Sequence, residues 1–490
     1  MSTAADRDAS LGRVLMVAPP DDWLQQGSEW FDAFRPAGVI LFRRHLPDRL
    51  EAARAAIARL HAWAAAQGRK LLVAADEEGG FVSQVRHLFP VPPSARALAW
   101  AAPPAEVRRV TARYAARLRA LGLGWSFAPV CDVNDNPRNP VIGVRAFGTA
   151  PEQVREHAAA AQAGLHDAGL HSCLKHFPGH GDTDLDSHLT LPVLAHGRER
   201  LDRVELVPFR ALLAGAPAVM VAHLACPELG DGELPATLSP RVSTELLRRE
   251  LGFSGVAVTD AMEMEGVAGV FGVGEAAWRA LAAGCDLLLY CFALSRVEEA
   301  RDGLAAALAA GRLSAARLEE AAARVERLAA MARPPAPELP PPAEDAAWYK
   351  ALCGQALRLE APSAWKRFWQ AGEGQTLRLA GWNEEVLLAL SQRFEGLGIP
   401  TQCAAPELLA DYTAPTLAVL AERRPLGASA SAALRRLAGG SGPVALANLL
   451  TPEVDAPVAA AFPARLQSAD RSDLMLDTVV ERCLALRHSS

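Results

Sequence analysis

The chain has 490 residues, of which 50% are hydrophobic and 22% charged, and its formal net charge is -6. This composition predicts a globular protein with a large core and about two domains. The net charge is small and negative, and no Lys/Arg-rich run alternates with aromatic residues, which argues against nucleic acid as the main partner.

The sequence also lacks the signals of a secreted or membrane-bound protein. No apolar run reaches the length that spans a bilayer. The segment Met1–Leu11 has no basic stretch followed by an apolar one. The eight cysteines form no Cys-x-x-Cys pair, and several lie in or beside apolar runs, which favours buried thiols in a reducing compartment. We therefore expect a cytoplasmic protein without membrane contacts.

Short apolar segments alternate with helical patterns along the first two thirds of the chain. Eight strands are predicted, at Val14–Val17, Gly38–Phe42, Leu71–Ala75, Trp125–Val130, Ser172–Lys175, Val219–His223, Val256–Thr259 and Asp286–Tyr290. Their interiors are apolar nearly throughout, which is typical of parallel strands buried on both faces. Eight strand–helix units predict a (β/α)8 barrel of the TIM type over residues 1–333.

A proline-rich segment over residues 334–345 predicts a linker, because it cannot join a packed helix or a central strand. Residues 346–490 then read as a smaller α/β domain. Its strands are predicted at Thr376–Gly381, Thr416–Leu420, Val444–Asn448 and Arg465–Ser468, with helices at Glu384–Leu397 and Leu474–Leu486. This second domain contains no comparable group of acidic residues and histidines, so we expect it to pack on the barrel or to form an oligomer contact.

Five successive barrel strands end in titratable side chains. These are Asp76, Asp132, Lys175 with His176, His223 and Asp260. The carboxyl ends of the strands meet at one face of such a barrel, where functional groups gather. The sequence therefore predicts a pocket ringed by these residues.

Two features near this pocket suggest catalytic groups. A carboxylate at the end of a strand, as at Asp260, can attack a carbon electrophile and form a covalent intermediate. The loop that follows Lys175 and His176 contains Asp186 two residues before His188. Such an aspartate can bind one imidazole nitrogen and raise the basicity of the other, so His188 can act as an acid and then as a base.

At this point the motifs resemble a known family. Lys-His-Phe-Pro-Gly-His-Gly at 175–181, followed by Asp-Ser-His at 186–188, is similar to the signature of the β-N-acetylglucosaminidase branch of glycoside hydrolase family 3. Further matching segments lie in family order at Gly38–Phe42, Asp76–Gly80, Phe127–Val130 with Asp132–Val133, Asn139–Gly143 with Arg145 and Phe147–Gly148, Met220–His223, Pro235–Ser239, and Leu251–Gly255 with Thr259–Asp260.

The resemblance implies a retaining exo-glycosidase that hydrolyses terminal β-linked N-acetylglucosamine from muropeptides or chitin-derived oligosaccharides. Asp260 would be the nucleophile and His188, oriented by Asp186, the acid/base. The resemblance further implies that the sugar hydroxyls are bound by Asp76, Arg145, Lys175 and His176, and that His223 lines the pocket. No metal or other cofactor is implied.

The chain departs from the family pattern at two positions near the pocket. Phe81 and Gln84 stand where the family usually has arginines, while Arg86 is in place. A non-catalytic carbohydrate-binding protein on the same fold is therefore an alternative. β-Glucosidase specificity and transfer to phosphate also stay open, although the β-glucosidases of the family take their acid/base from the second domain and lack the Asp-Ser-His loop.

Three further assignments concern residues near the pocket. Asp132 could bind loop backbone or the sugar, and Glu77 and Glu78 are expected to be structural or solvated. His176, His180 and His188 could form a metal site, but Pro178 and Gly179 interrupt the helical spacing that such a site usually has. We predict no metal here, and the sequence leaves the oligomeric state open.

Overall fold

A computed structural model describes residues 10–25, 29–185, 191–331, 341–409, 414–421, 426, 428–450, 458 and 460–488. Among the helices in these ranges, none combines the length and the apolar character needed to cross a bilayer. All eight cysteines carry free thiols, and seven of them are buried, as predicted.

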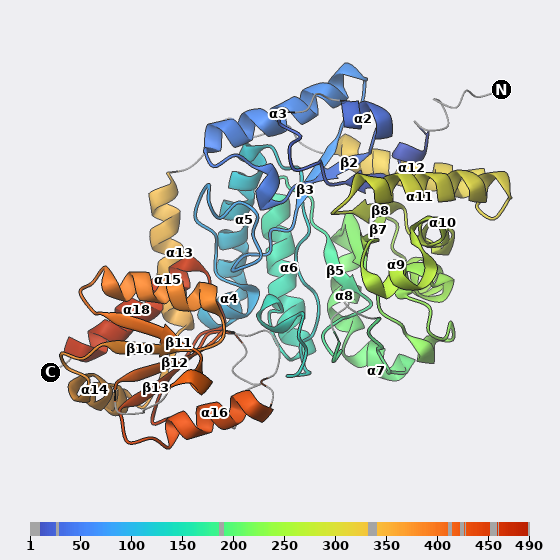
Figure 1. Cartoon of the computed structure of the whole chain (residues 1–490). Helices are drawn as coiled ribbons and strands as arrows, with labels where there is room; N and C mark the ends of the chain where they lie inside the picture. The colour runs from blue at the N-terminus through green and yellow to red at the C-terminus, as the bar shows by residue number, and fades with distance from the viewer. Residues whose placement is uncertain are drawn as a thin grey trace.

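Eight parallel strands form the first sheet. They are β1 (Leu15–Val17), β2 (Gly38–Ile40), β3 (Leu72–Ala75), β4 (Trp125–Ser126), β5 (Leu174–Phe177), β6 (Ala218–Val221), β7 (Val256–Ala261) and β8 (Leu287–Tyr290). The hydrogen-bonded order is β4-β3-β2-β1-β8-β7-β6-β5. Isolated parallel bridges join Trp125 to His171 and Val130 to Lys175, and they close the sheet between β4 and β5. The predicted barrel and its eight strands are therefore confirmed (Figure 1).

Helices surround this sheet. The longer ones are α3 (Leu50–Ala66), α5 (Pro104–Leu121), α6 (Pro151–Asp167), η6 (Arg241–Glu250), α10 (Val273–Ala283), α11 (Leu294–Ala309) and α12 (Ala315–Met331). The shorter ones are α2 (Glu29–Phe34), α4 (Ala95–Ala101), α7 (Arg198–Arg203), α8 (Leu206–Leu212), α9 (Glu265–Phe271), η1 (Arg43–His45), η2 (Gly143–Arg145), η3 (Leu213–Gly215), η4 (Pro227–Leu229) and η5 (Ala236–Leu238).

The strands are apolar throughout because alternate residues enter two different cores. In β3, Val73 and Ala75 pack outward with the helices, whereas Leu72 and Ala74 pack in the barrel interior. Side chains alternate between the two faces of a strand, so both faces must be apolar when both are covered. Val325 and Leu328 of α12 join the interior cluster and cover the end of the barrel where the strands begin.

The second domain contains a six-stranded sheet. Its strands are β9 (Arg358–Glu360), β10 (Leu377–Ala380), β11 (Thr401–Ala404), β12 (Thr416–Leu420), β13 (Val444–Asn448) and β14 (Ala464–Gln467), in the order β11-β10-β12-β13-β14-β9. Only β9 is antiparallel to its neighbour. The described helices are α13 (Pro342–Ala356), α14 (Pro362–Ala371), α15 (Glu384–Glu395), η7 (Pro406–Leu408), α16 (Ala428–Ala438) and α18 (Asp473–His488). This is the smaller α/β domain that the sequence predicts.

Helix α13 attaches the second domain to the barrel. Asp345 of α13 is fully buried and pairs with Arg113 (2.8 Å) and Arg117 of α5. Beyond this contact, the backbone N–H of Ser94, at the start of α4, donates to Asp470 Oδ2 at 3.1 Å. Figure 1 shows the second domain, in orange and red, beside α4 and α5. The helix begins at Pro342, inside the range predicted for the linker, because proline suits the first turn of a helix.

Candidate active site

Side chains from the carboxyl ends of the strands surround a cavity of about 230 Å³. Its lining residues are Phe42, Asp76, Glu78, Val82, Gln84, Val141, Arg145, Lys175, His176, His180, Met220, Asp260, Ala261, Leu289, Cys291 and Phe292. Five residues assigned from the sequence lie here together, namely Asp76, Arg145, Lys175, His176 and Asp260. They come from four separate segments, so the barrel brings together what the chain keeps apart.

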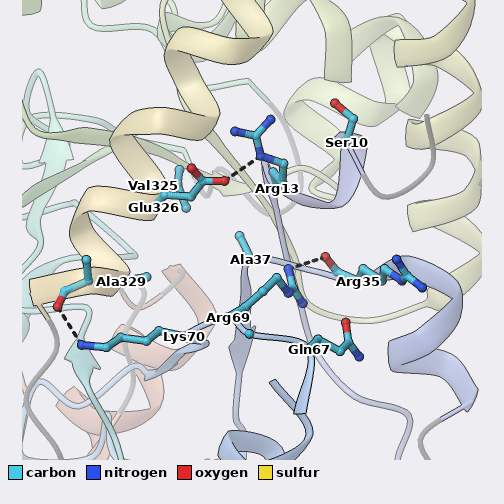
Figure 2. Close-up of a pocket in the computed structure, with 12 residues that line it drawn as sticks. Ser10, Arg13, Arg35, Ala37, Gln67, Arg69, Lys70, Val325, Glu326 and Ala329 are labelled. Atoms are coloured by element: carbon cyan, nitrogen blue, oxygen red, sulfur yellow. Dashed lines mark hydrogen bonds and ion pairs between the residues drawn. The ribbon is translucent and has the colours of Figure 1, made fainter. Parts of the chain in front are cut away.

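A larger hollow, of about 960 Å³, lies at the opposite end of the barrel, where the strands begin. Figure 2 shows Arg13 paired with Glu326, and Arg69 and Lys70 bonded to backbone carbonyls on its wall. In barrels of this type the catalytic groups lie at the carboxyl ends of the strands, and the other end serves stability. The smaller cavity is therefore the candidate active site.

Glu78 lies between the two cations of the cavity. Its carboxylate accepts two hydrogen bonds from Arg145, at 2.8 and 2.7 Å, and lies 2.6 Å from Lys175 Nζ. Lys175 also donates to Asp76 Oδ1 at 2.7 Å. Burial disfavours the ionised carboxylate, but Arg145 and Lys175 outweigh it and hold the pKa of Glu78 far below its usual range. Burial alone would lower the pKa of Lys175, but Asp76 and Glu78 raise it to about 12. Glu78, Lys175 and Arg145 are therefore ionised near neutral pH.

Asp132 holds the two histidines of the cavity. Its Oδ2 lies 2.7 Å from His176 Nδ1, and its Oδ1 accepts the backbone N–H of His180 at 2.7 Å. Arg145 Nη2 lies 3.3 Å from His176 Nε2, and a guanidinium can only donate, so Nε2 is the acceptor and the proton is on Nδ1. Burial lowers the pKa of His180 to about 4. Burial tends to raise the pKa of Asp132, but the contacts with His176 lower it more, so the pKa of Asp132 lies below its ordinary value.

Asp260 is the second-last residue of strand β7 and borders the cavity. Its Oδ1 accepts the backbone N–H of Ala261 at 2.8 Å, which fixes one carboxylate oxygen. The carboxylate is partly exposed, unlike the fully buried Asp132. The geometry therefore places an oriented and accessible carboxylate at the cavity wall.

His223 lies next to this strand end and does not line the cavity. It is fully buried, its Nδ1 is 2.8 Å from Thr237 Oγ1, and its Nε2 is 3.0 Å from the carbonyl oxygen of Ala261. A carbonyl can only accept, so Nε2 carries the proton. The contacts of His223 therefore support the backbone beside Asp260.

Asp186 and His188 lie outside the described residues. The chain just before them is fixed by polar contacts with the loop after β4. Asn139 Nδ2 donates to the carbonyls of His180 (2.7 Å) and Gly181 (3.1 Å), and Asp184 accepts from Asn136 at 2.5 Å. These contacts hold the first half of the loop against the barrel.

Glu78 lines the cavity, although the sequence motifs do not single it out as a site residue. The alternation of β3 continues past its end, since Ala74 points inward and Asp76 and Glu78 both reach the cavity. Glu77 faces the other way and accepts from Gln84 N at 2.7 Å and from the Tyr114 hydroxyl. Burial raises the pKa of Glu77 to about 7. Because side chains alternate between the two faces of a strand, continuing the alternation of β3 would have predicted that Glu78 faces the cavity and Glu77 does not.

The two departures from the family pattern have structural partners. Gln84 lines the cavity, and its Oε1 accepts the backbone N–H of Arg43 at 3.1 Å. Phe81 packs against the core of the second domain, and the Arg471 guanidinium lies 5.1 Å from its ring. Phe81 is therefore part of the contact between the two domains.

Relatives match about half of this chain in sequence, and solved structures match nearly its whole length. A β-hexosaminidase of Chromobacterium violaceum is 42% identical over 279 residues, which cover 56% of this chain and 75% of that protein. β-Hexosaminidase A of Pseudoalteromonas piscicida is 35% identical over 277 residues, 52% of this chain, but the match spans only 46% of that protein.

A solved family-3 β-N-acetylglucosaminidase from Paenibacillus sp. is 28% identical and aligns with a TM-score of 0.83 over 99% of this chain and 97% of its own. The family model of the glycosyl hydrolase family 3 N-terminal domain matches residues 14–328 of this chain. The family expected from the motifs is thereby confirmed: the chain belongs to glycosyl hydrolase family 3.

Proposed function

We propose that this glycoside hydrolase is a retaining exo-β-N-acetylglucosaminidase. The observation that carries the proposal is the position of Asp260, an oriented carboxylate that borders a cavity lined by two cations and two further carboxylates. The relatives described as β-hexosaminidases and the solved β-N-acetylglucosaminidase support the choice of sugar. The substrates would be muropeptides or chitin-derived oligosaccharides with a terminal β-linked N-acetylglucosamine.

The size of the cavity favours cleavage at the end of a saccharide. At about 230 Å³ it is smaller than the roughly 300–1,000 Å³ of sites for drug-sized ligands. A single sugar ring fits this scale, with the rest of the substrate outside. Asp76, Lys175, Arg145 and His176 would bind its hydroxyl groups, because they offer ionised donors and acceptors in fixed positions.

In the first step Asp260 would attack the anomeric carbon. The carbon–oxygen bond to the leaving group breaks, and His188 donates a proton to that oxygen, which leaves a covalent glycosyl-aspartate. In the second step His188 takes a proton from water, the water oxygen attacks the same carbon, and the Asp260 carboxylate is released. Asp186 would orient the imidazole in both steps.

The charge of the cavity suits this reaction. Asp76, Glu78 and Asp260 line the cavity together with the cations Arg145 and Lys175, so the lining carboxylates exceed the cations by one. A transition state with positive charge on the sugar ring is stabilised by such an excess. The same excess repels an anionic acceptor, which favours water over phosphate.

Kinetics with two aryl glycosides test the proposal. An aryl N-acetyl-β-glucosaminide should be cleaved with a higher kcat/KM than the matching β-glucoside, and added phosphate should not produce a sugar phosphate. Asp260→Asn should abolish turnover, whereas Asp302→Asn, an exposed aspartate on α11, should not change it. Preference for the glucoside would contradict the proposal. Ligand binding without turnover would identify a carbohydrate-binding protein instead.

The role of His188 has its own test. His188→Ala should slow aryl substrates with poor leaving groups far more than those with good ones, because good leaving groups need no proton. Equal losses on both substrates would remove His188 from the acid role while leaving Asp260 as the nucleophile.

A further inference from the structure

A second group of titratable side chains lies outside the candidate active site. Asp182 follows strand β5, His196 precedes α7, and Glu205 immediately precedes α8. One possible ligand atom from each of the three lies within 4.8 Å of those of the other two. His196 Nε2 is 2.6 Å from Asp182 Oδ2. None of these residues borders the cavity of the candidate active site.

The charges in this group do not balance. Arg200 lies 3.0 Å from Glu205 Oε1 and 3.9 Å from Asp182 Oδ2, and it also pairs with Asp135. Three carboxylates therefore share one guanidinium, and burial raises the pKa of Glu205 although Arg200 opposes this. A divalent cation would provide the positive charge that this group lacks.

Two carboxylate oxygens in the same group lack donors. Glu205 is only 2% exposed, and its Oε2 is buried without a hydrogen-bond partner among the described residues. The same holds for Asp135 Oδ1. The Cβ and Cγ atoms of Glu205 pack against Gly179, where an added Cβ would lie 2.7 Å from the Glu205 Cβ. A buried acceptor without a donor costs free energy, and a bound cation would remove this cost.

The geometry points to a divalent-cation site formed by Asp182, His196 and Glu205. One imidazole and two carboxylates suit zinc, whose ligand distances are about 2.0–2.2 Å, with water as a fourth ligand. The guanidinium of Arg200 would stay on Glu205 Oε1 and Asp135, and the cation would take the Asp182 and His196 side of the group. The neutral imidazole would then carry its proton on Nδ1, which leaves the Nε2 lone pair for the metal.

The position of this site gives it a role. Asp182 and His196 flank residues 183–195, the segment that contains Asp186 and His188. A cation bound to both residues would fix the two ends of that segment at one point. This role, unlike the binding itself, rests on the proposed function.

Zinc titration of the whole chain tests the site. After removal of metals with a chelator, the protein should bind one zinc ion in competition with a chromophoric chelator at pH 7.5. Cobalt should give the absorption bands of a low-symmetry site. His196→Ala and Asp182→Asn should each weaken zinc binding by more than tenfold. His61→Ala, at a histidine on α3, should have no effect.

The outcomes are distinct from those of the activity tests. If zinc fails to bind, or binds His196→Ala as well as the unmodified chain, the site is wrong and the group is only an ion-pair cluster. If His188→Ala loses zinc while His196→Ala keeps it, the metal belongs to the proposed catalytic segment and the inference is also wrong. Failure of the proposed function would appear as absent turnover with zinc binding unchanged.

Discussion

Replacing Glu78 with glutamine should destabilise the barrel, although the two side chains have the same shape. The carboxylate is 4% exposed and makes three contacts of 2.6–2.8 Å with Arg145 and Lys175. The amide of glutamine can accept a bond through one atom only, and its NH2 group would face a cation. Lys175 would then keep Asp76, which is 26% exposed and 2.7 Å away, whereas Arg145 would lose the carboxylate with which it pairs.

Removing one partner of a buried ion pair typically costs about 3–5 kcal/mol, because the remaining charge stays buried. Asp76 compensates Lys175 in part, so we expect about 3 kcal/mol. With about 2.1 cal/mol/K of unfolding entropy per residue and roughly 300 residues in the barrel, this corresponds to about 5 °C in melting temperature.

Thermal unfolding followed by near-ultraviolet circular dichroism measures this difference. The matched control is Glu319→Gln, the same change at a carboxylate that is 57% exposed and pairs with Arg13 at 2.8 Å. An exposed pair contributes about 0–1 kcal/mol, which corresponds to less than about 2 °C. Equal shifts in the two variants would refute the argument that burial makes the charge of Glu78 important.

Three further predictions concern single residues. Burial raises the pKa of Glu77 from 4.5 to about 7, so its contribution to stability is present at low pH and lost as the pH rises from about 4.5 to about 7. The melting temperature should therefore fall more across this window in the unmodified chain than in Glu77→Gln, and parallel pH profiles would contradict the assignment. Asp132→Asn should reduce kcat/KM by at least about 100-fold, because the amide would favour the wrong tautomer of His176; unchanged kinetics in a folded variant would exclude this orienting role. Phe292 is 67% exposed at the cavity rim, and Glu263 accepts its backbone N–H at 2.9 Å. Phe292→Ala should raise KM several-fold with little change in kcat if the ring stacks on the leaving group, and a fall in kcat alone would argue against stacking.

The barrel could be predicted because each of its strands is covered on two faces. Continuous apolar runs such as Leu71–Ala75 are then required, and they are visible in the sequence. The second sheet shows the opposite case. Its edge strands β9 and β11 are half exposed and contain charged or polar residues, so no apolar run marks them. The four central strands could therefore be predicted from the sequence, whereas these two edge strands could not.

The candidate site divides in a similar way. Residues at strand ends, such as Asp76, Lys175 and Asp260, follow from the barrel rule and the motifs together. The role of Glu78 depends on contacts with residues 67 and 97 positions away, and no spacing in the chain encodes those distances. Phe81 is explained only by the second domain, whose Arg471 lies 390 positions later.

The closure of the barrel between β4 and β5 has a consequence for every charge substitution at the site. This seam has isolated bridges and no continuous ladder, and it includes the backbone bonds from Ser126 N to His171 O and from Cys131 N to Lys175 O. Lys175 reaches across it to Asp76, and His176 reaches across it to Asp132. The side chains proposed to bind the sugar therefore also hold the barrel closed between β4 and β5. Hydrogen exchange at the amides of Ser126 and Cys131 would report whether a variant has lost a sugar contact alone or has also opened the seam.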